Sequence, residues 1–270
     1  MFADSKLQEL LEQAERGVAG AQVNIGLMYA EGRGVSPDIA KAKEWWERAA
    51  AQGHMVAQCN LGAMYIDGYG APPNFSQAKD LYEKAAAQGY AGAQYGLGVM
   101  FTNGHGVPQD YVKAKEWYEK AATQGYARAQ YNLSLVYADG QGVPQDFDQA
   151  SVWCEKAAAQ GYAAAQYNLG VMYGKGLGVN QDYIKSKEWH EKAAAQGYMG
   201  AQVSLGVMYV EGRGVSQDYV LAYKWLKLAA EQGNENAVRV CDGVLSKNLT
   251  PEQITEAQRL VLEWKPTGGK

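Results

Sequence analysis

Residues 90–125 read YAGAQYGLGVMFTNGHGVPQDYVKAKEWYEKAATQG and contain two helical patterns joined by a Gly-x-Gly turn. The first pattern runs from Tyr90 to Asn103 and the second from Asp110 to Gln124. Apolar residues of the second pattern recur at i, i+3, i+4, i+7 and i+8, the spacing of one helix face: Ala114, Trp117, Tyr118, Ala121 and Ala122. This stretch therefore predicts a pair of amphipathic helices.

The ends of these helices carry strong local signals. Asp110 stands where an N-cap is expected, and the same place is taken by Asp38, Asn74, Asp146, Asp182 and Asp218. Gly125 follows the second helix, where a left-handed C-terminal cap is usual. We expect at least one glycine of each Gly-x-Gly turn, such as Gly32 or Gly34, to have a positive φ.

The stretch is one copy of a repeat with a period of 36 residues. An Ala-Gln pair marks each copy, at Ala21-Gln22, Ala57-Gln58, Ala93-Gln94, Ala129-Gln130, Ala165-Gln166 and Ala201-Gln202. Such regular periods are typical of solenoids, in which neighbouring units cover one another's apolar faces. We therefore predict an all-α fold, a right-handed α/α solenoid of six repeats.

Two finer expectations concern packing. Gly98, which recurs in most repeats, predicts close approach of a neighbouring helix backbone. Glu116 and Lys120, at i and i+4, predict an ion pair on the solvent face of the second helix.

The motifs A-Q-x-x-L-G-x-M-Y-x-x-G-x-G-V-x-Q-D-Y and K-A-x-x-W-Y-x-K-A-A-x-Q-G resemble Sel1-like repeats, which are relatives of the tetratricopeptide repeat. The resemblance covers residues 17–232 and implies a binding scaffold. Some cysteine-rich Sel1-like proteins have been linked to β-lactam binding or hydrolysis, but this chain lacks the cysteine pair that those proteins carry in each repeat.

We expect one solenoid domain over residues 1–270. It divides into an N-terminal capping helix (1–16), six repeats (17–232), C-terminal capping helices (233–264) and a tail (265–270). Thr250, Pro251 and Gln253 form a helix-start pattern in the last cap.

Composition narrows the class of partner. The chain has 25 Lys+Arg against 29 Asp+Glu, so it lacks the basic excess of a nucleic-acid-binding protein. No apolar run is long enough to insert into a membrane. Phe2-Ala3-Asp4 fits either a cytoplasmic start or the remnant of a cleavage site whose leader peptide was removed. A removed leader would make the protein periplasmic or secreted. We expect a monomer.

The residues give no sign of catalysis. His54, His105 and His190 occupy unrelated repeat positions without ligand spacing, so we predict no metal site and expect surface or partly packed side chains. Cys59, Cys154 and Cys241 are far apart in sequence, and we expect free thiols. No nucleotide or nucleophile motif is present, so we predict no cofactor and no enzyme activity.

A partner is expected on the first helices, which line the concave surface of two-helix solenoids. Two rows and one charge mark this surface: Tyr95, Tyr131 and Tyr167; Asn60, Asn132 and Asn168; and Arg128. Tyrosine is enriched at interfaces, and asparagine can pair with a peptide backbone. The same residues also suit packing between adjacent first helices.

The main hypothesis is therefore a bacterial adaptor, regulator or immunity-type protein that binds a protein or peptide. The alternatives are an enzyme of the β-lactam-binding kind and a self-assembling structural element.

Overall fold

The computed structural model describes residues 2–69 and 72–267, and every regular element in these residues is a helix. The chain forms two compact units, residues 1–129 and residues 130–270. The all-α repeat fold is thus confirmed, whereas the assignment of the whole chain to one domain stays a prediction.

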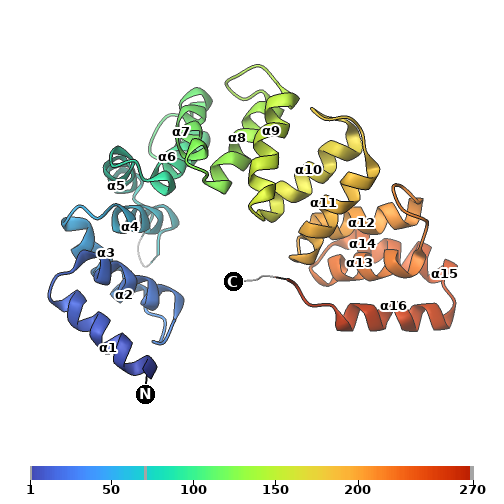
Figure 1. The fold of residues 1–270 in the computed structure, drawn as a ribbon, viewed down its shortest axis with the longest axis horizontal. Coiled ribbons are helices and arrows are strands. Elements are labelled where there is room, and N and C mark those ends of the chain that lie inside the picture. Colours follow the sequence, from blue (N-terminus) through green and yellow to red (C-terminus); the bar gives the residue numbers. More distant parts are fainter. Residues whose placement is uncertain (1, 70–71, 268–270) are drawn as a thin grey trace. The chain divides into compact units, whose positions relative to one another are not determined.

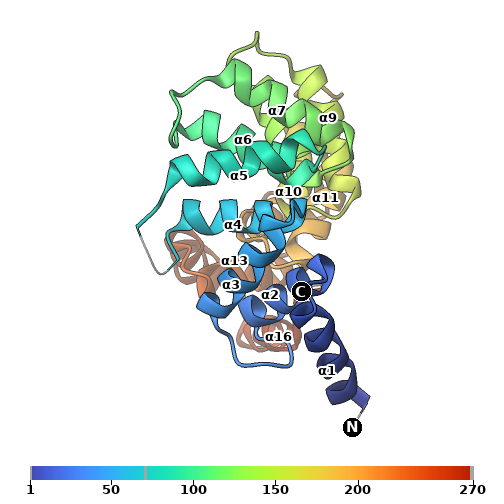
Figure 2. The same ribbon diagram turned by 90° about the vertical axis from the view of Figure 1, so that its left-hand side faces the viewer.

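Each repeat contributes a first and a second helix that pack against each other (Figure 1). The first helices are α2 (Ala19–Glu31), α4 (Met55–Asp67), α6 (Ala91–Asn103), α8 (Ala127–Asp139), α10 (Ala163–Lys175) and α12 (Met199–Glu211). The second helices are α3 (Ile39–Ala51), α5 (Phe75–Ala87), α7 (Tyr111–Thr123), α9 (Phe147–Ala159), α11 (Tyr183–Ala195) and α13 (Tyr219–Glu231). In Figure 2 the helices of the unit of residues 1–129 can be followed in chain order from α1 to α7.

Additional helices lie at both ends of the repeats. Helix α1 (Phe2–Glu15) precedes them, and α14 (Glu235–Val240), the π-helical turn η1 (Cys241–Leu245), α15 (Ser246–Asn248) and α16 (Pro251–Glu263) follow. Leu7, Leu10 and Leu11 of α1 pack against Ile25 of the first repeat. Helix α16 begins with the expected capping box between Thr250 and Gln253.

The expected tail is partly ordered against the last repeats. Thr267 donates from its backbone N–H to the carbonyl of Ala195, at 2.7 Å. Residues 268–270 of the predicted tail, like Gly70 of the predicted turns, lie outside the described residues.

The predicted N-caps are confirmed in all six second helices. The side chain of each capping Asp, or of Asn74, accepts a hydrogen bond from the backbone N–H three residues later. For Asp110 this bond to Lys113 is 3.0 Å long. The cap fixes where each second helix starts, because one of its otherwise unpaired N–H groups is satisfied.

The glycine turns also form as predicted. Gly32 and Gly34 have φ of 69° and 73°, and Gly104 and Gly106 repeat this geometry. A side chain in this region would be strained, so the turn requires glycine. Gly125, after the second helix, has a φ of 87°.

The repeated helix glycine accommodates a side chain rather than a neighbouring backbone. A Cβ atom on Gly98 would lie 2.5 Å from the Tyr118 ring, which belongs to the second helix of the same repeat. The expectation of close backbone approach was wrong, because the second helix fills the space with its own buried residue. The equivalent pairs are Gly26 with Trp46, Gly62 with Tyr82, Gly170 with His190, and Gly206 with Leu226.

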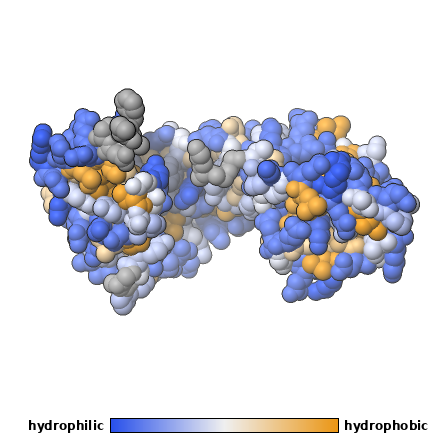
Figure 3. Space-filling view, turned by 90° about the horizontal axis from the view of Figure 1, so that it is seen from below, coloured by the Kyte–Doolittle hydropathy of each residue, from blue (hydrophilic) through white to orange (hydrophobic). Residues whose placement is uncertain are grey.

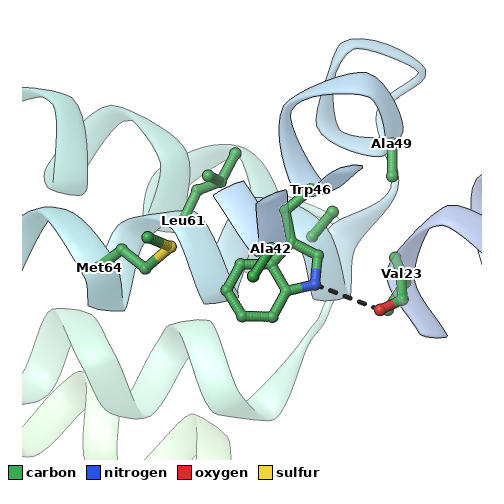
Figure 4. Packing of buried hydrophobic residues seen from close by; sticks show 7 residues of the cluster. Val23, Ala42, Trp46, Ala49, Leu61 and Met64 are labelled. Carbon is green, nitrogen blue, oxygen red and sulfur yellow. Dashed lines mark hydrogen bonds between the residues drawn. The ribbon is translucent and has the colours of Figure 1, made fainter. Parts of the chain in front are cut away.

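Figure 4 shows the first of these buried side chains. The Trp46 ring lies among Ala42, Leu61 and Met64, and its Nε1 donates to the carbonyl of Val23 at 3.2 Å. The ring therefore joins both helices of the first repeat to the next repeat.

In the fourth repeat both members of this pair differ, and the two changes compensate each other in size. Ser134 replaces the glycine, and the facing residue is the smaller Cys154, which is fully buried. Ser134 donates to the Tyr131 carbonyl at 2.7 Å, and Cys154 donates to the Ala165 carbonyl at 3.3 Å. The side chain that serine adds on the first helix is thus balanced by a smaller side chain on the second helix.

A second buried contact recurs in all six repeats and joins two glutamines 30 residues apart. The Ala-Gln glutamine accepts from the glutamine that ends the second helix, at 2.7 to 3.0 Å: Gln22 from Gln52, Gln58 from Gln88, Gln94 from Gln124, Gln130 from Gln160, Gln166 from Gln196, and Gln202 from Gln232. The first member of each pair is buried. A buried amide needs such a partner, because it is desolvated on folding.

The charged pairs on the second helices lie in a different register from the expected one. Lys115 pairs with Glu119 at 2.7 Å, whereas Lys120 lies 4.0 Å from the centre of the Trp117 ring. The predicted pairing of Glu116 with Lys120 is therefore wrong. Trp117 is only partly buried, and the lysine stem covers the exposed part of its ring.

We predict that Gly98→Ser destabilises the protein by about 1–3 kcal/mol, because the new side chain would overlap the Tyr118 ring. Combining it with Tyr118→Cys copies the pair found in the fourth repeat. The double variant should be more stable than the sum of the single changes by about 1 kcal/mol or more. Urea unfolding measures all three variants. Gly20→Ala, where no atom lies within 4 Å of the new Cβ, is the control and should not be destabilising.

We also predict that Gln166→Leu lowers the free energy of unfolding by about 2 kcal/mol, because two hydrogen bonds of about 0.5–1.5 kcal/mol each are lost. The amide of Gln166 accepts from Gln196 at 2.8 Å and donates to the Ala158 carbonyl at 3.2 Å. The exposed Gln13→Leu should change stability by less than about 0.5 kcal/mol. Equal effects at the two positions in thermal unfolding would contradict a structural role for the pair.

Candidate functional site

In the unit of residues 1–129, the structure brings three of the predicted residues together. Asn60 of α4, Tyr95 of α6 and Arg128 at the start of α8 line one cavity of about 360 Å³. Arg128 is exposed, and it forms no ion pair with any residue in the described parts of the chain. This cavity therefore presents an uncompensated positive charge at its edge.

Two glycines of α6 leave space for aromatic rings that line this cavity. Gly96 stands where four of the other repeats have asparagine, and a Cβ there would lie 2.7 Å from the Tyr82 ring. A Cβ on Gly92 would lie 2.8 Å from the Tyr90 ring and 3.5 Å from the Cys59 sulfur. The aromatic rings thus occupy the positions next to the helix backbone, and no side chain from α6 covers them there.

The polar groups around the cavity are mostly hydrogen-bond donors or neutral. The Asn60 side-chain nitrogen is buried without a hydrogen-bond partner. Burial raises the pKa of Cys59 to about 12, so its thiol is protonated at neutral pH and lacks the thiolate needed of a nucleophile. Tyr95 packs on Tyr126, with ring centres 5.3 Å apart, and on Tyr118 at 6.0 Å.

In the unit of residues 130–270, the predicted residues contact one another. Asn168 donates to the hydroxyl of Tyr131 at 3.2 Å. Tyr131 packs edge-on against Tyr162 at 5.3 Å, and Tyr167 packs against Tyr198 at 5.1 Å. All of these residues, and Asn132, are partly buried. These tyrosines therefore have a packing role, and each also keeps some surface exposed.

Sequence reasoning missed a cavity in this unit, and none of the predicted site residues lines it. It has a volume of about 260 Å³ and lies among α10, α11 and α12, with Gly174, Ser186 and His190 in its lining. His190 is only 3% exposed, so the expectation of a surface or partly packed histidine was wrong for this residue. The signal was available, because position 190 aligns with Trp46, Tyr82 and Tyr118 of the buried pairs.

Other kinds of site are not supported by the described residues. No group of three or more His, Cys, Asp or Glu residues in residues 2–69 and 72–267 has the arrangement of a metal site. None of the helices described is long and apolar enough to cross a bilayer. On the face in Figure 3, hydrophobic residues form small separate groups among hydrophilic ones.

Comparison with known proteins identifies the repeat. The Sel1 repeat model matches residues 19–54, 56–90, 91–126, 127–162, 163–198 and 200–234. No curated protein sequence matches the chain.

Several solved structures share the fold. A protective antigen of uropathogenic Escherichia coli strains, with an SLR fold, is 37% identical, with a TM-score of 0.80 over 95% of this chain and 56% of that chain. A Sel1 repeat protein from Oxalobacter formigenes is 32% identical, with a TM-score of 0.76 over 84% of this chain and 99% of that chain. An immunity protein from Pseudomonas aeruginosa is 22% identical, with a TM-score of 0.57 over 86% of this chain and 88% of that chain, and so shares the fold alone.

We predict that His190 makes the protein less stable as the pH falls from about 6.5 to 4. Burial lowers the pKa of His190 from 6.5 to about 4, so the unfolded chain takes up a proton in this range before the folded one does. Between pH 7 and pH 5 this contributes about 2 kcal/mol to the loss of stability. His190→Leu, which copies Leu226, should reduce the pH dependence of urea unfolding by that amount. An unchanged pH dependence in this variant would show that the imidazole is not desolvated.

Proposed function

Because the chain belongs to the Sel1 repeat family, whose members mediate protein–protein interaction, we propose that it is a non-enzymatic scaffold that holds a protein or peptide against its first helices. The observation that carries this proposal is the cavity of residues 1–129 that unites Asn60, Tyr95 and Arg128. Adaptors, regulatory subunits and immunity proteins all work by binding of this kind.

The cavity has the features of a contact site. Its lining combines aromatic rings with an exposed arginine, and aromatic residues and arginine dominate the binding energy of protein interfaces. The uncompensated charge of Arg128 favours an acidic group on the partner, since a charge-assisted hydrogen bond is stronger than a neutral one. Asn60 adds a donor at the same site.

In the unit of residues 130–270, a separate contact surface is proposed, formed by Tyr131, Asn132, Tyr167 and Asn168. Their mutual packing and the Asn168–Tyr131 hydrogen bond hold the rings in fixed positions. Fixed rings lose little conformational freedom on binding, which favours affinity. We further propose that the protein acts as a monomer.

We predict that Arg128→Ala weakens binding of the natural partner by about thirtyfold, the loss typical of an interface hot spot of about 2 kcal/mol. The full chain is used to capture proteins from its source organism, the recovered partner is identified by mass spectrometry, and its Kd is measured by calorimetry. The melting temperature should hardly change, because the side chain is exposed.

Arg16→Ala is the matched control. Arg16 has the same charge, lies in the same unit and is 76% exposed, but does not line the cavity. Its removal should leave the Kd unchanged. Equal loss in both variants would indicate a general charge effect, and no loss in either would exclude this cavity as the contact site. Light scattering over a range of concentrations checks the monomer.

A further inference from the structure

The second repeat lacks a tryptophan that the other five repeats have on their second helices. They have Trp45, Trp117, Trp153, Trp189 and Trp225 at this position, whereas the second repeat has Leu81. A cavity of about 370 Å³ lies beside Leu81, among α3, α4 and α5 of the unit of residues 1–129. It shares no lining residue with the cavity of Asn60, Tyr95 and Arg128, so it is a separate site.

The third repeat shows what occupies the corresponding space when the tryptophan is present. Trp117 packs against the cluster that contains Ala86 of the preceding second helix and Leu97 of its own first helix. The tryptophans of the fifth and sixth repeats pack against the equivalent clusters. In the second repeat the equivalent residues are Ala50 and Leu61, and both line the cavity. The cavity therefore lies where the other repeats place an indole ring.

The exposure of the alanine beneath the ring shows that Leu81 does not replace the indole. Where a tryptophan follows 31 residues later, this alanine is buried, with exposed fractions of 7%, 2%, 1% and 0% at Ala86, Ala122, Ala158 and Ala194. Ala50, which is followed at the same spacing by Leu81, is only partly buried. The shorter side chain thus leaves apolar surface open at the cavity.

A lysine stands ready to cover a ring in the cavity. Lys120, Lys156 and Lys192 each follow their tryptophan by three residues, and their Nζ atoms lie 4.0, 3.9 and 3.8 Å from the ring centres. Lys84 follows Leu81 at the same spacing and lines the cavity, and it forms no ion pair in the described parts of the chain. Because an ammonium group is attracted to the face of an indole, Lys84 favours an aromatic occupant.

We propose that this cavity receives the side chain of a tryptophan from a protein partner. The ring would lie on Ala50 and Leu61, beneath Lys84, as the ring of Trp117 lies within the third repeat. The exposed Asp80 also lines the cavity, and its carboxylate can accept a hydrogen bond from the indole N–H. The proposal rests on the proposed scaffold function only in that the partner is a protein, and it adds a contact away from Arg128.

The test titrates three probes into the full chain and follows the protein by NMR: N-acetyl-L-tryptophanamide, N-acetyl-L-leucinamide and free L-tryptophan. The tryptophan amide should shift the resonances of Ala50, Leu61 and Lys84. The leucine amide should bind about tenfold more weakly, because it buries less apolar area and offers Lys84 no ring. Equal binding of the two amides, or no shift at these residues at the highest soluble concentration, would overturn the proposal. Tighter binding of free L-tryptophan would overturn the assignment to a protein partner.

Two opposite variants connect the binding to the cavity. Leu81→Trp, which restores the residue of the other five repeats, should abolish binding of the tryptophan amide and raise the melting temperature, because its own ring fills the cavity. Trp117→Leu should create a second binding site, with new shifts at Ala86, Leu97 and Lys120. Unchanged binding or a lower melting temperature in Leu81→Trp, or no second site in a folded Trp117→Leu variant, would contradict the proposal. If Trp117→Leu does not fold, Leu81→Trp decides alone.

The outcome is separable from that of the proposed function. If the natural partner loses affinity for Arg128→Ala but binds Leu81→Trp as tightly as the native chain, the tryptophan site is wrong although the scaffold role holds. If the partner loses affinity for Leu81→Trp alone, the tryptophan site stands and the proposed Arg128 contact fails.

Discussion

The hydrogen bond between two glutamines is the contact on which each repeat depends. It connects the buried glutamine of a first helix to the C-terminal end of the second helix, thirty residues later. The amides of Gln22 and Gln166 also donate to a carbonyl of the preceding helix, that of Ala14 in α1 and that of Ala158 in α9. One buried side chain thus holds three helices. Because an unpaired buried amide is costly, the Ala-Gln pair recurs in all six repeats.

Features that depend on neighbouring residues could be predicted from the sequence. An N-cap such as Asp110 and a turn glycine such as Gly104 act on backbone atoms a few residues away, so their residue types predict the geometry. Contacts between side chains of different helices were harder to predict from the sequence. Gly98 correctly indicated close packing, but its partner Tyr118 is a side chain of another helix. The predicted ion pair between Glu116 and Lys120 was wrong because Lys120 lies over the ring of Trp117 instead.

The candidate site likewise has some features that the sequence predicts and others that it does not. Asn60, Tyr95 and Arg128 were selected by their repeat positions, and the structure places them around one cavity. For Tyr131 and Asn168 the sequence left packing and binding equally open, because a tyrosine and an asparagine suit both. Their hydrogen bond shows the packing role directly. The cavity beside His190 was missed, although a histidine aligned with buried aromatic residues was a visible signal.

The repeats also explain how one frame can produce different cavities. The caps, the turns and the glutamine pair fix the two helices of every copy, so the residue between them can change from Trp46 to Leu226 without loss of the fold. Tyr82, Cys154 and His190, which occupy this same position, each line a cavity, of about 360, 330 and 260 Å³. In a repeat protein of this kind, the helices therefore keep a cavity at the same repeat position, and the copies differ in the side chains that line it.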